Sequence, residues 1–262
     1  MEVSSNYAWQ CHDVKRHNSP LLPSNIRGLI VGKSNSGKTI VLLNLLLQDG
    51  WLDYNRLLVF GKSLHQQEYR IIRKGFESGL SKQQISNIFK NQQELPKGNS
   101  PTQLMQKYVD EGGALDGGDI NATFFENCFD QIPDPAKLND CDKNLLILDD
   151  CLLEKKQNKA EAYYTRGRHN NCDTIYIAQN YILLPKNTIR ENSNILLLFP
   201  QDKRDLQRIH ADHCTDIDYE EFKDFCHDVW SNRYNFVMID LTSSKYNGKY
   251  RRNFDIFYFP HK

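Results

Sequence analysis

The run from Gly32 to Thr39 reads Gly-Lys-Ser-Asn-Ser-Gly-Lys-Thr and contains the residue types that bind the phosphates of a nucleotide. It fits the template of a glycine, four residues, and Gly-Lys-Ser/Thr at every required position. Backbone N–H groups in such a loop surround an anion, and the dipole of the following helix strengthens the attraction. We therefore expect a nucleoside triphosphate to be bound by Gly32, Lys33, Ser34, Asn35, Ser36, Gly37, Lys38 and Thr39.

Two side chains of this loop have separate expected roles. Lys38 would reach the β- and γ-phosphates, and the Thr39 hydroxyl would ligate Mg²⁺, so ATP and Mg²⁺ are the expected ligands. The alternative is a loop that fits the template by chance. The flanking segments argue against chance, because residues 26–31 have the apolar pattern of a strand and residues 39–47 that of a helix.

Two acids end a second apolar segment, Leu145-Leu146-Ile147-Leu148-Asp149-Asp150. A strand of this kind places its last carboxylates at the edge where open α/β sheets bind ligands. Asp149 would hold Mg²⁺ together with Thr39, and Asp150 would act as the general base on an attacking water. A second acid favours hydrolysis over small-molecule phosphorylation. The alternative is an ordinary strand end with solvated acids.

Gln179 follows a further apolar segment, residues 174–178. An amide at the tip of a neighbouring strand can contact both the γ-phosphate and the attacking water, so Gln179 is the candidate sensor. The alternative is a polar residue that simply starts a loop.

Three arginines are candidates for a contact with the γ-phosphate bound by a neighbouring subunit. An arginine keeps its charge in any environment, and its planar fork grips phosphate oxygens. Each could instead be a surface ion-pair partner. The candidates are Arg166, Arg168 and Arg190.

Composition limits the class of protein. Lys plus Arg and Asp plus Glu both number 33, which argues against a wholly polycationic nucleic-acid binder. No apolar run is long enough to cross a bilayer, and residues 1–6 lack the apolar core of a signal peptide. The seven cysteines form no CxxC pair, which is typical of free thiols in a reducing compartment.

Two further groups of residues have competing interpretations. Arg70, Arg73, Lys74, Arg251 and Arg252 could contact nucleic acid, although charge clusters are usually solvated faces. A zinc site could be drawn from His210, His213, Cys214, Cys226 and His227. Their spacing matches no standard zinc site, and residues 205–213 and 219–230 have the pattern of amphipathic helices, which favours ordinary helix packing.

The elements that must position these residues alternate between strand and helix. A chain of 262 residues suits one large domain, and we expect an arm over residues 1–24 followed by a single ATPase domain over residues 25–262. Strands are expected at 26–31, 56–60, 122–125, 144–148, 174–178, 195–199, 236–241 and 254–259. Helices are expected at 39–47, 65–77, 81–90, 102–111, 154–166, 186–191, 205–213 and 219–230. Apolar strands separated by helices predict a mostly parallel sheet with helices on both faces.

These motifs together resemble the FtsK–HerA superfamily of P-loop ATPases, most of all the genome-packaging ATPases of the poxvirus type and of Polinton (Maverick) and adintovirus elements. The resemblance spans about residues 26–240 and depends on Gly32 to Thr39, on Leu145 to Asp150, and on Arg166-Gly167-Arg168-His169 leading to Gln179 and to Leu184 through Asn192. Much of the wider superfamily has Asp-Glu where this chain has Asp149-Asp150, and Asp is one methylene shorter than Glu.

The resemblance implies a RecA-like (ASCE) fold and a homo-oligomeric ring, a pentamer or hexamer, in which an arginine of one subunit completes the next subunit's site. It implies ATP-driven movement of double-stranded DNA into a viral capsid or portal vertex. The expected location is the virion or the interior of the host cell, nucleus or cytoplasm.

Three other functions remain open on the same residues. A cellular HerA-like translocase or helicase would use the same chemistry. A nucleotide or small-molecule kinase would turn over as a monomer without DNA. A scaffold that only binds nucleotide would not hydrolyse it. A terminase-type subunit is disfavoured, because the chain offers no second acidic cluster for two-metal cleavage.

Overall fold

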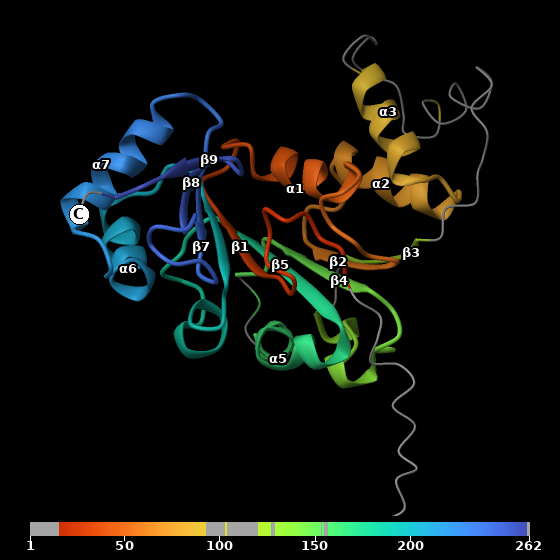
Figure 1. Cartoon of the computed structure of the whole chain (residues 1–262). Helices are drawn as coiled ribbons and strands as arrows, with labels where there is room; N and C mark the ends of the chain where they lie inside the picture. The colour runs from red at the N-terminus through yellow and green to blue at the C-terminus, as the bar shows by residue number, and fades with distance from the viewer. Residues whose placement is uncertain are drawn as a thin grey trace, which may run out of the picture.

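The computed structural model describes residues 16–92, 103, 120–126, 129–152, 154 and 157–260. Their centre is a sheet with the strand order β3-β2-β4-β5-β1-β6-β7-β8-β9 (Figure 1). The pairs from β3 to β6 are parallel, and the pairs from β6 to β9 are antiparallel. The sheet is therefore mostly parallel, as the alternation of strands and helices predicts.

The strands are β1 (Arg27–Val31), β2 (Arg56–Gly61), β3 (Asn121–Phe125), β4 (Asn144–Asp149), β5 (Cys172–Ala178), β6 (Ile195–Leu198), β7 (Val237–Asp240), β8 (Tyr250–Arg252) and β9 (Ile256–Tyr258). The α-helices are α1 (Lys38–Leu47), α2 (Gln67–Glu77), α3 (Lys82–Gln92), α5 (Asn158–Arg166), α6 (Lys203–His213) and α7 (Tyr219–Trp230). Short helical turns are η1 (Phe129–Gln131), η2 (Pro135–Lys137), η3 (Gly167–Asn170) and η4 (Lys186–Arg190).

Each face of the sheet has its own apolar core. Along β1, Leu29 and Val31 belong to one core and Ile30 to the other, because successive side chains of a strand point to opposite faces. The first core includes Tyr163 of α5, and the second includes Leu42 of α1. Figure 1 shows α1, α2 and α3 on one side of the sheet and α5 on the other. Burial on both faces explains why these strands are continuously apolar.

The order of the strands establishes the fold class. β1 leads into the phosphate-binding loop and β4 ends in the two acids, and β5 is inserted between them. A strand placed between the loop-bearing strand and the acid-bearing strand is the arrangement expected of a RecA-like P-loop ATPase. The chain therefore has the RecA-like α/β fold.

Most of the expected elements are present, and the differences are local. The helix expected over 154–166 begins only at Asn158, and the helix expected over 186–191 is a π-helical turn. The strand β8 was not expected, since it is three residues long and two of them are arginines. At the start of α3, Ser81 Oγ accepts a hydrogen bond from the Gln84 backbone N–H at 3.3 Å. The helix expected over 102–111 lies almost entirely outside the described residues.

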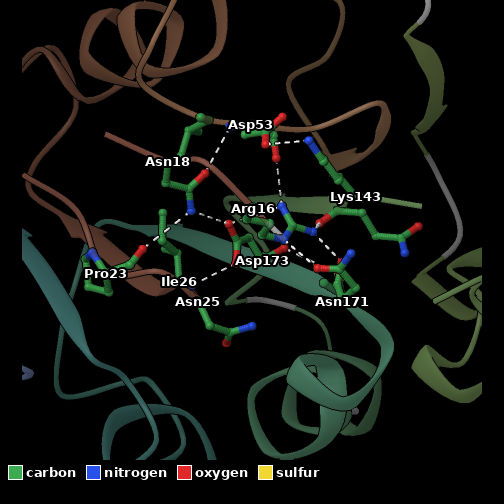
Figure 2. A network of polar contacts seen from close by, with 12 residues as sticks. Arg16, Asn18, Pro23, Asn25, Ile26, Asp53, Lys143, Asn171 and Asp173 are labelled. Carbon is green, nitrogen blue, oxygen red and sulfur yellow. Dashed lines mark hydrogen bonds and ion pairs between the residues drawn. The ribbon is translucent and has the colours of Figure 1, made fainter. Parts of the chain in front are cut away.

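A buried ion pair joins the N-terminal segment to the amino ends of the parallel strands (Figure 2). Arg16 Nη1 lies 3.2 Å from Asp173 Oδ2, and the two side chains are 4% and 1% exposed. The same guanidinium donates to Asn171 Oδ1 at 2.9 Å, to the Asp53 carbonyl at 3.0 Å, and to the Asn144 and Asn171 carbonyls. The Arg16 guanidinium is thus surrounded by acceptors from β4, β5 and the loop before β2.

Asp173 also has hydrogen-bond donors other than Arg16. It accepts hydrogen bonds from the Ile26 backbone N–H at 2.8 Å and from Asn18 Nδ2 at 2.9 Å. Burial raises the pKa of this carboxyl, and the charge of Arg16 opposes the rise. Residues 16–24 therefore pack against the body of the molecule. The boundaries expected at 1–24 and 25–262 stay a prediction.

The structure also tests the expectations about free thiols and about segments that could cross a membrane. Cys151, Cys172, Cys214 and Cys226 are free thiols and buried. Cys141 is disulfide-bonded, so the expectation of free thiols is wrong for that residue. No helix among the described residues is long and apolar enough to cross a membrane.

Candidate nucleotide-binding site

The phosphate-binding loop is held against both neighbours of β1. The Gly32 N–H donates to the Ala178 carbonyl at 3.1 Å, which ties the loop to the end of β5. A Cβ at Gly32 would come within 2.5 Å of the Phe199 Cβ, so no larger residue fits. Gly37 caps α1 with φ of 107°, a conformation that favours glycine. The two glycines of the motif are thus required by packing and by backbone geometry.

The loop offers several groups to an anion. The first N–H groups of α1 have no intrahelical acceptor, and no side chain caps them. The first turn of α1 contains no acidic residue that would repel a phosphate. Ser36 Oγ is buried and has no hydrogen-bond partner among the described residues. A buried hydroxyl without a partner is costly, and a phosphate oxygen would satisfy it.

Lys38 is folded back onto the loop. Its Nζ donates to the Gly32 carbonyl at 2.6 Å and to the Lys33 carbonyl at 2.8 Å. Burial lowers the pKa of this ammonium, while the carboxylates of Asp149 and Asp150 oppose that shift. The Lys38 ammonium therefore lies within electrostatic reach of both acids.

The acid pair ends β4 beside the end of β5. Asp149 pairs in register with Ile177, and the Asp150 N–H donates to the Ile177 carbonyl at 3.2 Å. The Tyr69 hydroxyl of α2 donates to Asp149 Oδ2. Burial raises the pKa of Asp149; the hydrogen bond from Tyr69 and the charge of Lys38 oppose the rise, and the charge of Asp150 adds to it. A cation bound in front of Asp149 would compensate for this burial.

Gln179 connects the acids to the loop. Its Nε2 lies 3.3 Å from both carboxylate oxygens of Asp150, and its Oε1 accepts from Ser34 Oγ at 3.4 Å. Gln179, Asp150 and the phosphate-binding loop are therefore adjacent, although they come from segments far apart in the sequence.

These groups line one cavity of about 1010 Å³. Its walls include loop residues 34–39, Asp149, Asp150 and Gln179, which the sequence analysis singled out. They also include residues that it did not: Ser63, Gln66, Glu68, Arg233, Tyr234, Asn235, Phe236 and Asn253. No sequence motif identifies these residues. Residues 231–235, for example, have only the composition of a polar loop. Glu68 adds a third carboxylate to the cavity.

The donors suit Mg²⁺ and the phosphates it accompanies. Mg²⁺ prefers hard oxygen ligands and usually takes one or two carboxylates together with phosphate oxygens. Asp149 and Thr39 both line the cavity. Both expected ligands therefore fit the ion.

The three candidate arginines lie elsewhere. Arg166 and Arg168 precede β5 and so lie at the amino ends of the parallel strands, opposite the phosphate-binding loop. Arg166 is 60% exposed and lies 3.8 Å from Asp134. Arg168 is exposed beside Arg27 and lines a separate cavity of about 450 Å³. Within one chain, these two arginines are remote from the acids.

Arg190 is buried instead. Its Nη1 lies 3.0 Å from Asp212 Oδ2, and its guanidinium lies 5.1 Å from the centre of the Tyr181 ring. Of the three arginines, this one is held inside its own subunit.

The other groups named from sequence have structural contacts. His210 Nε2 lies 2.9 Å from the Ile217 carbonyl, and Cys214 and Cys226 are buried in an apolar core. No cluster of three potential metal-ligating residues occurs in the part of the chain that the structure describes. Among the basic residues, Arg73 pairs with Glu126 at 2.5 Å, and Arg251 is buried beside Asp240 at 2.9 Å.

Comparison with protein-family models gives no match, and no curated protein matches the chain. Several solved structures resemble it. The genome packaging NTPase B204 from Sulfolobus turreted icosahedral virus 2, in complex with ATP-gammaS, is 11% identical over 90% of this chain and 100% of that chain, with a TM-score of 0.49. VirB4 of Thermoanaerobacter pseudethanolicus is 13% identical over 91% of this chain and 89% of that chain, with a TM-score of 0.44.

A third structure, EssC (ATPases 2 and 3) from Geobacillus thermodenitrificans, is 13% identical over 70% of this chain and 33% of that chain, with a TM-score of 0.34. Similarities this low assign neither a family nor a function, and the fold follows from the strand order and the phosphate-binding loop themselves.

Proposed function

We propose that the protein is an ATPase that uses hydrolysis to move double-stranded DNA, and that its task is to package a viral genome into a capsid. The observation that carries the ATPase assignment is the chain of contacts from Ser34 through Gln179 to Asp150, beside the acid pair and Lys38. These residues line one cavity, which supports binding and hydrolysis of a triphosphate there.

Nucleotide binding would begin at the loop. The α- and β-phosphates bind to the N–H groups of residues 34–39, and Ser36 Oγ supplies a further donor. Lys38 leaves the Gly32 and Lys33 carbonyls and contacts the β- and γ-phosphates. Mg²⁺ held by Asp149 and Thr39 would neutralise charge on the β- and γ-phosphates.

Hydrolysis would follow at the end of the cavity that holds the acids. Asp150 accepts a proton from the attacking water, whose oxygen forms a bond to the γ-phosphorus. The bond from that phosphorus to the β–γ bridging oxygen breaks, and ADP and phosphate are the products. Gln179 orients the water, because its amide already contacts Asp150.

A ring of identical subunits would complete the site. Arg166 and Arg168 are exposed at the edge opposite the cavity, where they cannot serve their own subunit but can face a neighbour's γ-phosphate. Arg190 is the third candidate, and it would first have to leave Asp212. A pentamer or hexamer that surrounds double-stranded DNA at a capsid or portal vertex is the proposed assembly, in the virion or inside the host cell.

The rival functions differ in what they require. A cellular HerA-like translocase shares the site and differs only in its biological setting, so neighbouring capsid genes would favour packaging. A nucleotide kinase needs no Asp150–Gln179 contact and would work as a monomer. The hydrogen bonds at 3.3 Å between these two residues favour hydrolysis.

The test is the steady-state ATPase rate with and without double-stranded DNA, read against the mass of the oligomer. Stimulation by DNA in a ring-sized species supports the motor, and a DNA-indifferent monomer would replace it with the kinase. Lys38→Ala should lower turnover about 100-fold or more, because it removes the positive charge that would contact the transferred phosphate. Lys203→Ala, at an exposed position of α6, is the matched control and should retain turnover. Wild-type turnover in Lys38→Ala would sink the ATPase assignment.

A further inference from the structure

The nucleotide cavity has a second end, away from the acids. β1 lies between β5 and β6, and β7 follows β6 in the sheet. Gln179 therefore lies on the β5 side of the loop. The turn before β7 lies on the other side, and it contains Arg233 and Tyr234. A triphosphate with its γ-phosphate at the acids extends its base toward that turn.

Tyr234 has the features of a ligand-contacting residue. The residue is 55% exposed, although it is a large aromatic that lines a cavity. A Cβ built at Gly37 would lie 3.3 Å from Tyr234 Cδ1, so the ring rests against the N-terminus of α1. Its φ is 69°, a left-handed conformation that costs energy for an aromatic residue. Strained backbone conformations of this kind are common at ligand-binding sites, where the surrounding structure maintains them.

The surroundings of this ring are arranged for a flat ligand. The Arg233 guanidinium lies 4.6 Å from the ring centre, and both residues line the cavity. Ile40 of α1, 57% exposed, is an apolar residue that lines the same cavity. An aromatic ring stacked with a guanidinium is a surface on which planar π-systems bind.

Two asparagines hold the turn in this shape. Asn253 Oδ1 accepts from the Phe236 backbone N–H at 3.2 Å, and Asn253 Nδ2 donates to Asn235 Oδ1 at 3.2 Å. Asn253 also has a left-handed φ, of 54°. The turn is thereby fixed to β8 and its following residues before any ligand arrives, which lowers the ordering cost of binding.

We propose that Tyr234 and Arg233 form the subsite for the purine base of the nucleotide, with the base stacked on the Tyr234 ring. This inference rests on the proposed binding of a nucleoside triphosphate at the phosphate-binding loop. It assigns the base to the turn between α7 and β7, which no sequence motif marks.

The experiment compares two ligands on the full chain in the presence of Mg²⁺. Calorimetric titration gives the Kd of ATP, which has a base, and of inorganic tripolyphosphate, which has none. Tyr234→Ala should raise the Kd of ATP about tenfold or more, since stacking on one aromatic side chain is worth that much. The Kd of tripolyphosphate should stay unchanged, and Tyr234→Phe should bind ATP like the wild type.

A matched control is Tyr246→Ala, which removes another half-exposed tyrosine that does not line the cavity. It should leave the affinity for both ligands unchanged. Equal ATP affinity in Tyr234→Ala and the wild type would overturn the subsite, and so would an equal loss for both ligands, because the effect would then be on the loop. A wild-type protein that binds neither ligand would instead overturn the proposed function, and the subsite with it.

Discussion

The amino and carboxyl edges of the sheet each hold an aspartate, and the two aspartates differ in how many of their hydrogen-bonding partners the chain itself supplies. At the amino edge, Asp173 receives Arg16, Asn18 and the Ile26 N–H from its own chain. At the carboxyl edge, Asp149 receives the Tyr69 hydroxyl and otherwise faces a cavity. The contacts of Asp173 are therefore complete once the chain is folded, whereas those of Asp149 leave room for a ligand.

The cations at the two edges differ in the same way. Arg16 is 4% exposed and its planar guanidinium is surrounded by acceptors that the fold holds in place. Lys38 is only half-buried and rests on two carbonyls of its own loop, which it can leave without breaking an ion pair. The amino edge therefore contributes mainly to stability, and the carboxyl edge is available for chemistry.

The largest expected effect is on turnover at the carboxyl edge. Asp150→Asn keeps the size of the side chain but removes the proposed base, and it should lower kcat about 10²- to 10⁴-fold. Its free energy of unfolding should change by less than about 0.5 kcal/mol, because the residue lies at a partly exposed strand end. ATPase assays and urea denaturation on the same protein measure both quantities.

Glu68→Gln is the matched control, since it makes the same change of charge in the same cavity. It should retain most of the turnover. If Glu68→Gln loses the activity and Asp150→Asn keeps it, Glu68 is the base and the assignment of Asp150 is wrong.

The second effect is on stability at the amino edge. Arg16→Met retains the apolar stem but leaves Asp173 buried without its cation, and it should lower the free energy of unfolding by about 3–5 kcal/mol. The folded fraction should still bind ATP with the wild-type Kd. Urea denaturation with a parallel ATP titration tests this. A loss below about 1 kcal/mol would mean that the network of Figure 2 contributes little to stability.

The smallest effect concerns a more exposed pair at the same edge. Lys143 Nζ lies 2.6 Å from Asp53 Oδ2, and the side chains are 24% and 25% exposed. Burial alone would raise the pKa of Asp53, but the hydrogen bonds from Lys143 and the His17 N–H outweigh it and hold the pKa below its usual value. Lys143→Met should lower the free energy of unfolding by about 0.5–1 kcal/mol at pH 7.

The sign of the pH dependence follows from the lowered pKa. Stability from Asp53 is present above the pKa of the unfolded chain and is lost as the pH falls through the pKa of the folded state. The difference between Lys143→Met and the wild type should therefore shrink in acid, as followed by denaturation at a series of pH values. A difference that stays constant into acid would show that the pair acts through packing and not through charge.

Much of the site could be predicted because local rules determine it. The phosphate-binding loop is a continuous motif, and Asp149 and Gln179 each directly end or follow an apolar strand. Parallel strands bring their carboxyl ends to one edge, so these residues had to lie near one another. Tyr234 and Glu68 obey no such rule, because their positions depend on how α7 and α2 pack.

The same division separates the arginines. Sequence placed Arg166, Arg168 and Arg190 in one class of surface candidates. In the structure Arg190 is buried with Asp212, while Arg166 and Arg168 remain exposed. Burial of an arginine requires a carboxylate at the right place, and Asp212 comes from α6, a separate element.

The sequence by itself determined the alternation of strands and helices, the phosphate-binding loop and the acids and amide at the strand ends, because each depends on neighbours along the chain. The tertiary structure decided which aspartate is satisfied by the chain and which faces a cavity, and it placed Tyr234 beside Gly37. Those outcomes depend on contacts between segments more than 100 residues apart, such as Arg16 with Asp173 and Ser34 with Gln179. Only the packed sheet brings such segments within hydrogen-bonding distance.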